Sequence, residues 1–190
     1  MLLLVGLGNP GSNYTNTRHN IGFKIIDAIN LHFKLSKQKP KFKGLLTTGN
    51  IESKKIYAIK PLTFMNNSGT AIKELIDYFK IDAKDVFVFH DDMDIDFGKI
   101  KAKFGGSSAG HNGIDSIDKF IGKDYSRVRV GIGHPKQKKK VNNHVLEDFK
   151  EDEEEKIKEI TDNIVKLIPT LIDKKIDLFS SKVNQDLNGI

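Results

Sequence analysis

The chain has 190 residues, 38% of them hydrophobic and 29% charged, and its formal net charge is +6 at pH 7. These values predict one globular domain spanning residues 1–190, and the lack of cysteine excludes disulfides and cysteine-ligated zinc or iron–sulfur centres. The apolar run at residues 1–5 is too short for a signal peptide, and no run approaches the length of a membrane span. We therefore expect no membrane partner, and the lack of cysteine is compatible with a reducing cytoplasm.

The charge is unevenly distributed along the chain. Residues 147–159 hold eight acids and three lysines, a local charge of −5, so the rest of the chain carries +11. A body of that charge attracts phosphate backbones through long-range electrostatics, which predicts a polyanionic substrate. The alternative is an ordinary lysine-rich surface that water solvates.

Strand and helix patterns alternate in the first half of the chain. Residues 2–5 form a continuous apolar run that glycines end, as in a buried strand, and apolar side chains at helical spacing predict a helix over about 20–33. The next segments predict, in order, an exposed lysine-rich connection at 34–43, a hairpin of 42–50 and 54–60, and a helix at about 68–80.

The second half continues this alternation. Residues 86–89 predict a buried strand, whereas 99–104 and 127–132 alternate charged and apolar residues and predict strands whose basic residues face outward. The other segments predict a loop at 105–113, a helix at 114–121, a solvated loop at 136–140, a helix at about 151–168 that Pro169 kinks or ends, a final helix at about 170–181, and a frayed tail after Lys182. This order indicates a single α/β domain with a twisted, mostly parallel mixed sheet flanked by helices.

Five short polar segments lie at the ends of predicted strands or the starts of predicted helices. They are Gly6–Gly11, Arg18–Asn20, Phe64–Gly69, His90–Asp94 and Gly110–Gly113. In open α/β sheets ligands bind beyond the carboxyl ends of the strands, so these segments can converge on one cleft. Together they offer an imidazole base, a carboxylate and asparagine amides, with no obvious serine nucleophile. That inventory suits hydrolysis by an activated water.

His19 and Asp91 are the candidate acid–base pair. A carboxylate that accepts the Nδ1 proton of an imidazole fixes its tautomer and leaves Nε2 as the base. Asn9 adds an amide near the sheet edge, and Asn66 and Asn112 can donate to an oxyanion without changing charge. The plainer alternatives are that His19 caps or packs a helix and that Asn66 and Asn112 cap the helices that follow them.

Two further patterns have weaker support. Gly6–Gly11 matches the dinucleotide fingerprint G-x-G-x-x-G, but a proline removes one amide and no helix opens at the last glycine. Asp92, Asp94 and Asp96 are spaced like the start of a calcium loop, but Lys103 stands where that loop needs glutamate. We expect a solvated turn at these acids, and a magnesium site there stays open.

Basic residues occupy alternate positions of two predicted strands. They are Lys99, Lys101, Lys103, Arg127 and Arg129. Alternate residues of a strand share one face, so this set predicts a surface that contacts phosphates. A lysine-bearing edge strand is also a common defence against aggregation.

Six motifs between about Val5 and Leu146 form a specific set. They are VGLGNPG, TRHNIG, KPLTFMNNSG, HDDMDIDFG, GGSSAGHNG and RVRVGIGHP. As a set they resemble bacterial-type peptidyl-tRNA hydrolase, a family that cleaves the ester joining a peptide to the terminal ribose of tRNA. The resemblance implies one catalytic domain with peptidyl-tRNA as its partner, no metal or cofactor, and a cytoplasmic monomer.

The resemblance also implies roles for individual residues. His19 matches the catalytic base, Asp91 the acid that stabilises its proton-accepting form, and Asn9 the residue that helps to distinguish N-blocked from free aminoacyl-tRNA. The substrate-binding positions match Tyr14, Phe64, Asn66 and Asn112. The positions that grip tRNA phosphates match Lys101, Lys103 and Arg129. The glycine loop departs from the family at Ser107-Ser108-Ala109, where some relatives have glycine or histidine, but no catalytic position is lost.

The alternative from another functional class is a catalytically silent RNA-binding protein of the same fold. It would explain the basic surface, but it gives no reason for the complete set of histidine, aspartate and asparagines.

Overall fold

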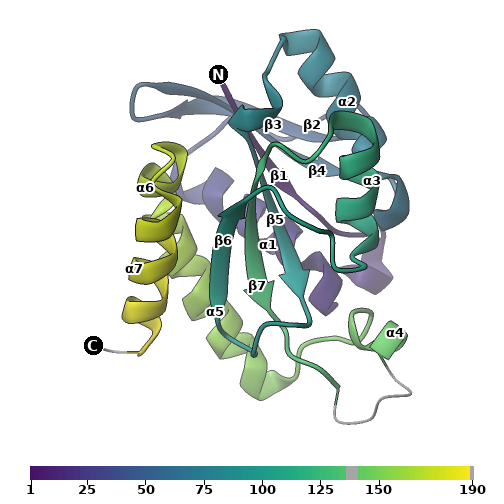
Figure 1. Ribbon diagram of the computed structural model, residues 1–190, viewed down its shortest axis with the longest axis vertical. Coiled ribbons are helices and arrows are strands. Elements are labelled where there is room, and N and C mark those ends of the chain that lie inside the picture. Colours follow the sequence, from purple (N-terminus) through teal and green to yellow (C-terminus); the bar gives the residue numbers. More distant parts are fainter. Residues whose placement is uncertain (136–140, 189–190) are drawn as a thin grey trace.

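The centre of the molecule is a mixed sheet, which Figure 1 shows in a computed structural model that describes residues 1–135 and 141–188. Over these residues the sheet has seven strands in the order β2-β3-β4-β1-β5-β7-β6. The strands are β1 (Leu2–Gly6), β2 (Lys39–Lys41), β3 (Gly44–Ile51), β4 (Lys54–Pro61), β5 (Val86–Asp92), β6 (Ile100–Phe104) and β7 (Ser126–Gly131).

The middle of the sheet is parallel and its outer strands are antiparallel. Strand β1 pairs in parallel with β4 and β5, and β5 pairs in parallel with β7. The hairpin β3–β4, the strand β2 and the strand β6 add antiparallel pairs at the two sides. This arrangement confirms the predicted mostly parallel mixed sheet, and it makes β1 and β5 the point where the chain changes its direction of winding.

Helices cover both faces of the sheet (Figure 1). They are α1 (Ile21–His32), α2 (Ser68–Phe79), α3 (Asn112–Ile121), α4 (Val141–His144), α5 (Glu151–Lys166), α6 (Ile168–Ile172) and α7 (Ile176–Asn188), with 3₁₀ turns at Ser12–Tyr14, Arg18–Asn20, Met65–Asn67 and Ala83–Asp85. None of the helices in the described ranges is both long and apolar enough to cross a membrane.

The alternating side chains of β1 divide the core into two layers. Leu2 and Leu4 pack in the cluster that includes α1, α5, α6 and α7. Leu3 and Val5 pack in the cluster that includes α2 and α3. Because successive strand residues point to opposite faces, one short apolar strand anchors both layers.

The C-terminal helix covers the free edge of β6, so the predicted frayed tail after Lys182 is wrong. The Asn184 side chain accepts from the Ile100 N–H at 3.0 Å and donates to the Ile100 carbonyl at 2.7 Å. Ser180 Oγ accepts from the Ala102 N–H at 2.8 Å. These contacts satisfy backbone groups that an edge strand would otherwise expose. Helix α7, which extends to Asn188, lies beside β6 (Figure 1).

Other predicted elements differ in detail. The exposed connection at 34–43 contains the edge strand β2, which tolerates Pro40 because an edge strand need not donate every N–H. The predicted helix at 170–181 is broken between α6 and α7, where Lys174 has a φ of 62°. Pro169 lies in the first turn of α6, just beyond the end of α5. The predicted loop at 136–140 lies outside the described residues.

Candidate active site

The predicted polar segments meet at the carboxyl ends of β1 and β5. The approach of α1 to these strands requires glycine at two facing positions. A Cβ atom on Gly6 would lie 2.2 Å from the Gly22 carbonyl oxygen, and a Cβ on Gly22 would lie 2.4 Å from the Leu7 nitrogen and from the Phe89 oxygen. This close packing brings the 3₁₀ turn before α1, and with it His19, against the end of β5.

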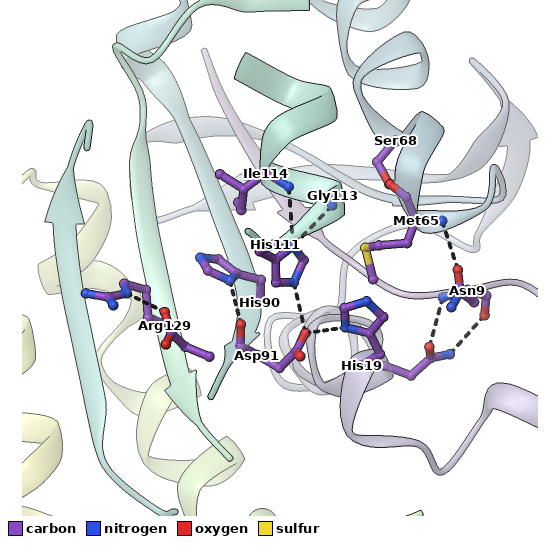
Figure 2. Close-up of polar contacts among 12 residues, drawn as sticks. Asn9, His19, Met65, Ser68, His90, Asp91, His111, Gly113, Ile114 and Arg129 are labelled. Carbon is purple, nitrogen blue, oxygen red and sulfur yellow. Dashed lines mark hydrogen bonds and ion pairs between the residues drawn. The ribbon is translucent and has the colours of Figure 1, made fainter. Parts of the chain in front are cut away.

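His19 and Asp91 form the predicted pair. Their Nδ1 and Oδ1 atoms lie 2.8 Å apart, and the Asp91 side chain is only 1% exposed (Figure 2). An ionised carboxylate can only accept, so Nδ1 carries the proton and donates it to Asp91. The lone pair of Nε2 is therefore free to act as a base.

A second histidine, His111, donates to the same oxygen of Asp91. Its Nε2 lies 3.0 Å from Oδ1, while its Nδ1 accepts from the backbone N–H groups of Gly113 at 3.1 Å and Ile114 at 3.3 Å (Figure 2). Because Nδ1 accepts, the proton of the neutral ring lies on Nε2 and points at Asp91. No role was predicted for this ring, and its only signal in the sequence is its place before a predicted helix.

The environment keeps Asp91 ionised. Burial alone would raise the pKa of Asp91, but the electrostatic attraction and hydrogen bonds of the His19 and His111 rings, which favour the ionised carboxylate, hold the pKa below its ordinary value. His90 adds a third ring, whose Nδ1 donates to the Asp91 carbonyl at 2.7 Å and whose centroid lies 4.8 Å from that of His111. Burial lowers the pKa of His90 well below its ordinary value, so this ring is neutral.

The Asn9 side chain is held in one orientation. Its Oδ1 accepts from the Met65 N–H at 2.8 Å, which leaves the amide NH₂ group as a donor (Figure 2). Two hydrogen bonds with the Asn20 side chain fix the Asn9 backbone. The Asn9 N–H donates to Asn20 Oδ1 at 2.8 Å, and the Asn9 carbonyl accepts from Asn20 Nδ2 at 3.0 Å.

Two cavities meet at His19. The first has a volume of about 180 Å³ and the second about 240 Å³. His19, Asn112 and Val145 line both. The first cavity is otherwise lined by Asp91, Asp92, Met93, Ser108, Ala109, Gly110 and His111. The second is otherwise lined by Asn9, Phe64, Met65, Asn66 and Leu146. The imidazole is thus accessible to a ligand that spans both.

The other predicted substrate-binding residues differ in whether they line a cavity at His19. Phe64, Asn66 and Asn112 line the second cavity and are exposed. The capping alternative for the asparagines is wrong, since His111 caps α3 and no side chain caps α2. Tyr14 lies in a 3₁₀ turn and does not line either cavity at His19.

The predicted basic surface exists on β6 and β7 but is smaller than expected. Lys101 pairs across the ladder with Arg129, and Lys103 pairs with Arg127. Burial, together with the charges of Arg129 and Arg127, lowers the pKa of Lys103, as expected where positive charge is concentrated. Arg129 Nε donates to Asp92 at 2.7 Å, so its charge is partly neutralised beside the first cavity.

Arg127 is not outward-facing, contrary to the prediction. Its side chain is 1% exposed, and it donates to Asp118 and to the Ser107 carbonyl at 2.8 Å each. Asp118 also accepts from the Tyr125 hydroxyl at 2.7 Å. Arg127 is therefore a structural cation that anchors the start of the glycine loop.

The metal and dinucleotide alternatives find no support in the geometry. In the described ranges, His19, Asp91 and His111 are the only cluster with ligand atoms close enough to share an ion, within 4.8 Å of one another. Their facing atoms are two N–H donors and one acceptor, which suits hydrogen bonds rather than metal coordination. The expected solvated turn is wrong at Asp92, which is buried and paired with Arg129.

The dinucleotide fingerprint also lacks its helix. The loop after β1 leads into a 3₁₀ turn, and α1 begins only at Ile21. The Asn9 N–H, which would have to face a phosphate, instead donates to Asn20.

Comparisons with known proteins identify the family of this chain. A family model described as Peptidyl-tRNA hydrolase matches residues 3–189. The peptidyl-tRNA hydrolase of Pelagibacter ubique is 72% identical over 97% of this chain and 99% of its own, and that of Ehrlichia ruminantium is 46% identical over 95% and 93%. The crystal structure of peptidyl-tRNA hydrolase from Acinetobacter baumannii is 34% identical, with a TM-score of 0.90 over 97% of this chain and 94% of that one. The chain therefore belongs to the peptidyl-tRNA hydrolase family.

Proposed function

We propose that this chain hydrolyses the ester bond between a peptide and the 3′-terminal ribose of tRNA, and so returns tRNA for reuse. The observation that carries the proposal is the His19–Asp91 pair, joined at 2.8 Å, with His19 in the wall that two cavities share. Membership of the family supports peptidyl-tRNA as the substrate.

His19 is the general base of the proposed reaction. Its Nδ1–H is held by Asp91, so Nε2 takes a proton from water as the water attacks the ester carbonyl. The resulting imidazolium is stabilised by the buried carboxylate and can return the proton to the departing ribose oxygen. General-base assistance of this kind contributes about 10²–10⁴ in rate.

Asn66 and Asn112 are the proposed donors to the oxyanion. Both line the second cavity, and neither side chain makes a hydrogen bond to another described residue, so their amides are available to substrate. One such donor contributes about 10²–10³ in rate. An aminoacyl ester is already reactive, so we propose that these two effects suffice without metal, cofactor or nucleophilic serine.

Asn9 is the proposed reader of the blocked amino group. Its NH₂ group is left as a donor because its Oδ1 accepts from Met65. An N-acylated substrate offers a carbonyl oxygen that can accept this bond, whereas a free ammonium group has only donors and would face another donor. The oriented amide therefore favours peptidyl-tRNA over aminoacyl-tRNA.

The tRNA backbone is proposed to lie along β6 and β7. Lys101 is exposed there, Lys103 lies beside it, and Arg129 connects this strip to Asp92 at the first cavity. Phe64 would contact the substrate in the second cavity, while Tyr14 would have to reach substrate outside the two cavities. The monomeric state, the cytoplasmic location and the extent of the catalytic domain over residues 1–190 stay predictions.

The decisive experiment compares release from N-acetyl-aminoacyl-tRNA and from unblocked aminoacyl-tRNA. We expect selective hydrolysis of the blocked substrate, and His19→Ala should abolish turnover while leaving tRNA binding largely intact. His32→Ala is the matched control, because His32 is an exposed histidine near the far end of α1. Binding of tRNA without release by the wild-type chain would instead support the silent RNA-binding protein.

A further inference from the structure

The segment 145–149, here called the strap, runs alongside the turn that carries His19. The His19 N–H donates to the Val145 carbonyl at 2.8 Å, and the Arg18 N–H donates to the Glu147 carbonyl at 3.0 Å. The Phe149 N–H donates to the Asn16 carbonyl at 3.2 Å. The strap therefore lies against the backbone of the proposed catalytic base.

The strap also forms part of the substrate cavities. Val145 lines both cavities at His19, and Leu146 lines the second. Any displacement of the strap would change the shape of the space on both sides of the imidazole. The position of this wall therefore bears on substrate binding.

One buried side chain, which lines neither cavity at His19, holds the strap. The Arg18 guanidinium, 4% exposed, donates through Nη1 to the carbonyls of Glu147 (3.2 Å) and Asp148, and through Nη2 to Glu153 Oε2 at 2.5 Å. It also lies over the Phe149 ring, 5.3 Å from the centroid. Charge-assisted bonds from a planar fork are stronger and more directional than neutral ones.

Glu153 links this contact to helix α5. The same Oε2 atom accepts from the Lys150 N–H at 2.8 Å, which caps the helix. The cation, the strap carbonyls and the start of α5 are thus joined at one carboxylate.

We propose that Arg18 is a positioning residue for the reaction, which fixes the strap beside His19 so that Val145 and Leu146 form a defined wall of the substrate site. The effect on substrate binding rests on the proposed function, whereas the fixing of the strap by Arg18 does not. His19 itself is oriented by Asp91, so loosening the strap should weaken substrate binding more than the chemical step.

The test uses Arg18→Lys, which keeps the charge but loses the fork, and Glu153→Ala, which removes the carboxylate. With N-acetyl-aminoacyl-tRNA we expect KM to rise about 5- to 10-fold while kcat stays within about twofold. Glu155→Gln is the matched control on the same helix, since Glu155 is exposed and has no ion pair with a described residue. Ile164→Val, in the buried core of α5, controls for a general loss of thermal stability.

Amide hydrogen exchange supplies a reading that does not depend on activity. The N–H groups of Arg18, His19 and Phe149 join the strap to the turn, so they should exchange about tenfold faster in Arg18→Lys than in wild type. Unchanged exchange and unchanged KM in folded Arg18→Lys and Glu153→Ala would overturn the proposal, as would an equal rise of KM in Ile164→Val. A wild-type chain without turnover would overturn the proposed function alone, because exchange would still report on the strap.

Discussion

The two contacts of His111 can be separated by comparing two substitutions. The ring uses Nδ1 to cap α3 and Nε2 to donate to Asp91. His111→Ala removes both contacts. His111→Asn keeps an oxygen that can cap the helix, because asparagine is a favoured N-cap residue, but its side chain is too short to donate to the carboxylate.

The size of each effect follows from the kind of bond that is lost. A hydrogen bond to a charged group is worth about 1.5–3 kcal/mol, and the Asp91 carboxylate is 1% exposed, so solvent does not replace the lost donor. If that loss is felt in the transition state, kcat falls about 10- to 100-fold, at about 1.4 kcal/mol per factor of ten. The cap contributes about 1 kcal/mol, which corresponds to roughly 2–4 °C in Tm for a chain of this size.

Measurements of kcat and Tm on both variants separate the contact with Asp91 from the helix cap. We expect His111→Asn to melt about 2–4 °C above His111→Ala while both variants show the same low kcat. In a chain that already carries Asp91→Asn, adding His111→Asn should not lower kcat further, because there is no carboxylate left to orient. Wild-type kcat in a folded His111→Asn variant would refute the reasoning, since the contact with Asp91 would then have no part in turnover.

Three other perturbations test the electrostatics. Folding lowers the pKa of Asp91, so the ionised carboxylate stabilises the fold at pH values above its unfolded pKa of about 4, and this stabilisation is lost as the pH falls below that value. The difference in Tm between wild type and Asp91→Asn should therefore become smaller from about pH 6 to about pH 3. Lys101→Ala and Lys103→Ala should each weaken tRNA binding and reduce the slope of log Kd against log salt by about one, whereas the exposed Lys158→Ala on α5 should leave the slope unchanged in the same titration. Asp118→Ala should lower the free energy of unfolding by about 3 kcal/mol in urea, since it leaves a buried guanidinium without its carboxylate; a loss below about 1 kcal/mol would show that water replaces that partner.

Much of the fold and the central pair could be predicted because the relevant signals are local. The apolar runs of β1 and β5 are followed directly by polar residues, and parallel strands bring their carboxyl ends to one edge. That rule predicts that the polar segments can converge on one cleft, and the 2.8 Å contact confirms the predicted pairing of His19 with Asp91. The catalytic role of the pair stays a prediction.

The errors concern residues whose environment depends on distant parts of the chain. The alternation in β7 correctly predicts a strand, but it cannot show that α3 brings Asp118 over Arg127 and buries it. The order of the residues after Lys182 was not predicted, because the Asn184 side chain bonds to Ile100 on β6, 84 residues away in the sequence. His111 was missed since a histidine before a helix gives no indication of which carboxylate its other nitrogen meets.

The site combines parts that are positioned in two different ways. Asp91 and Arg129 lie on strands, so the sheet ladder fixes them and a change in a loop should move them little. His19, Asn9 and the strap lie outside the sheet and depend on side-chain contacts, the reciprocal pair with Asn20 and the guanidinium of Arg18. Substitutions in these contacts should therefore change the parameters of catalysis by more than their effect on stability suggests. Substitutions in the Arg127–Asp118 pair should instead lower stability more than they change catalysis, because this pair stabilises the fold but does not line either cavity at His19.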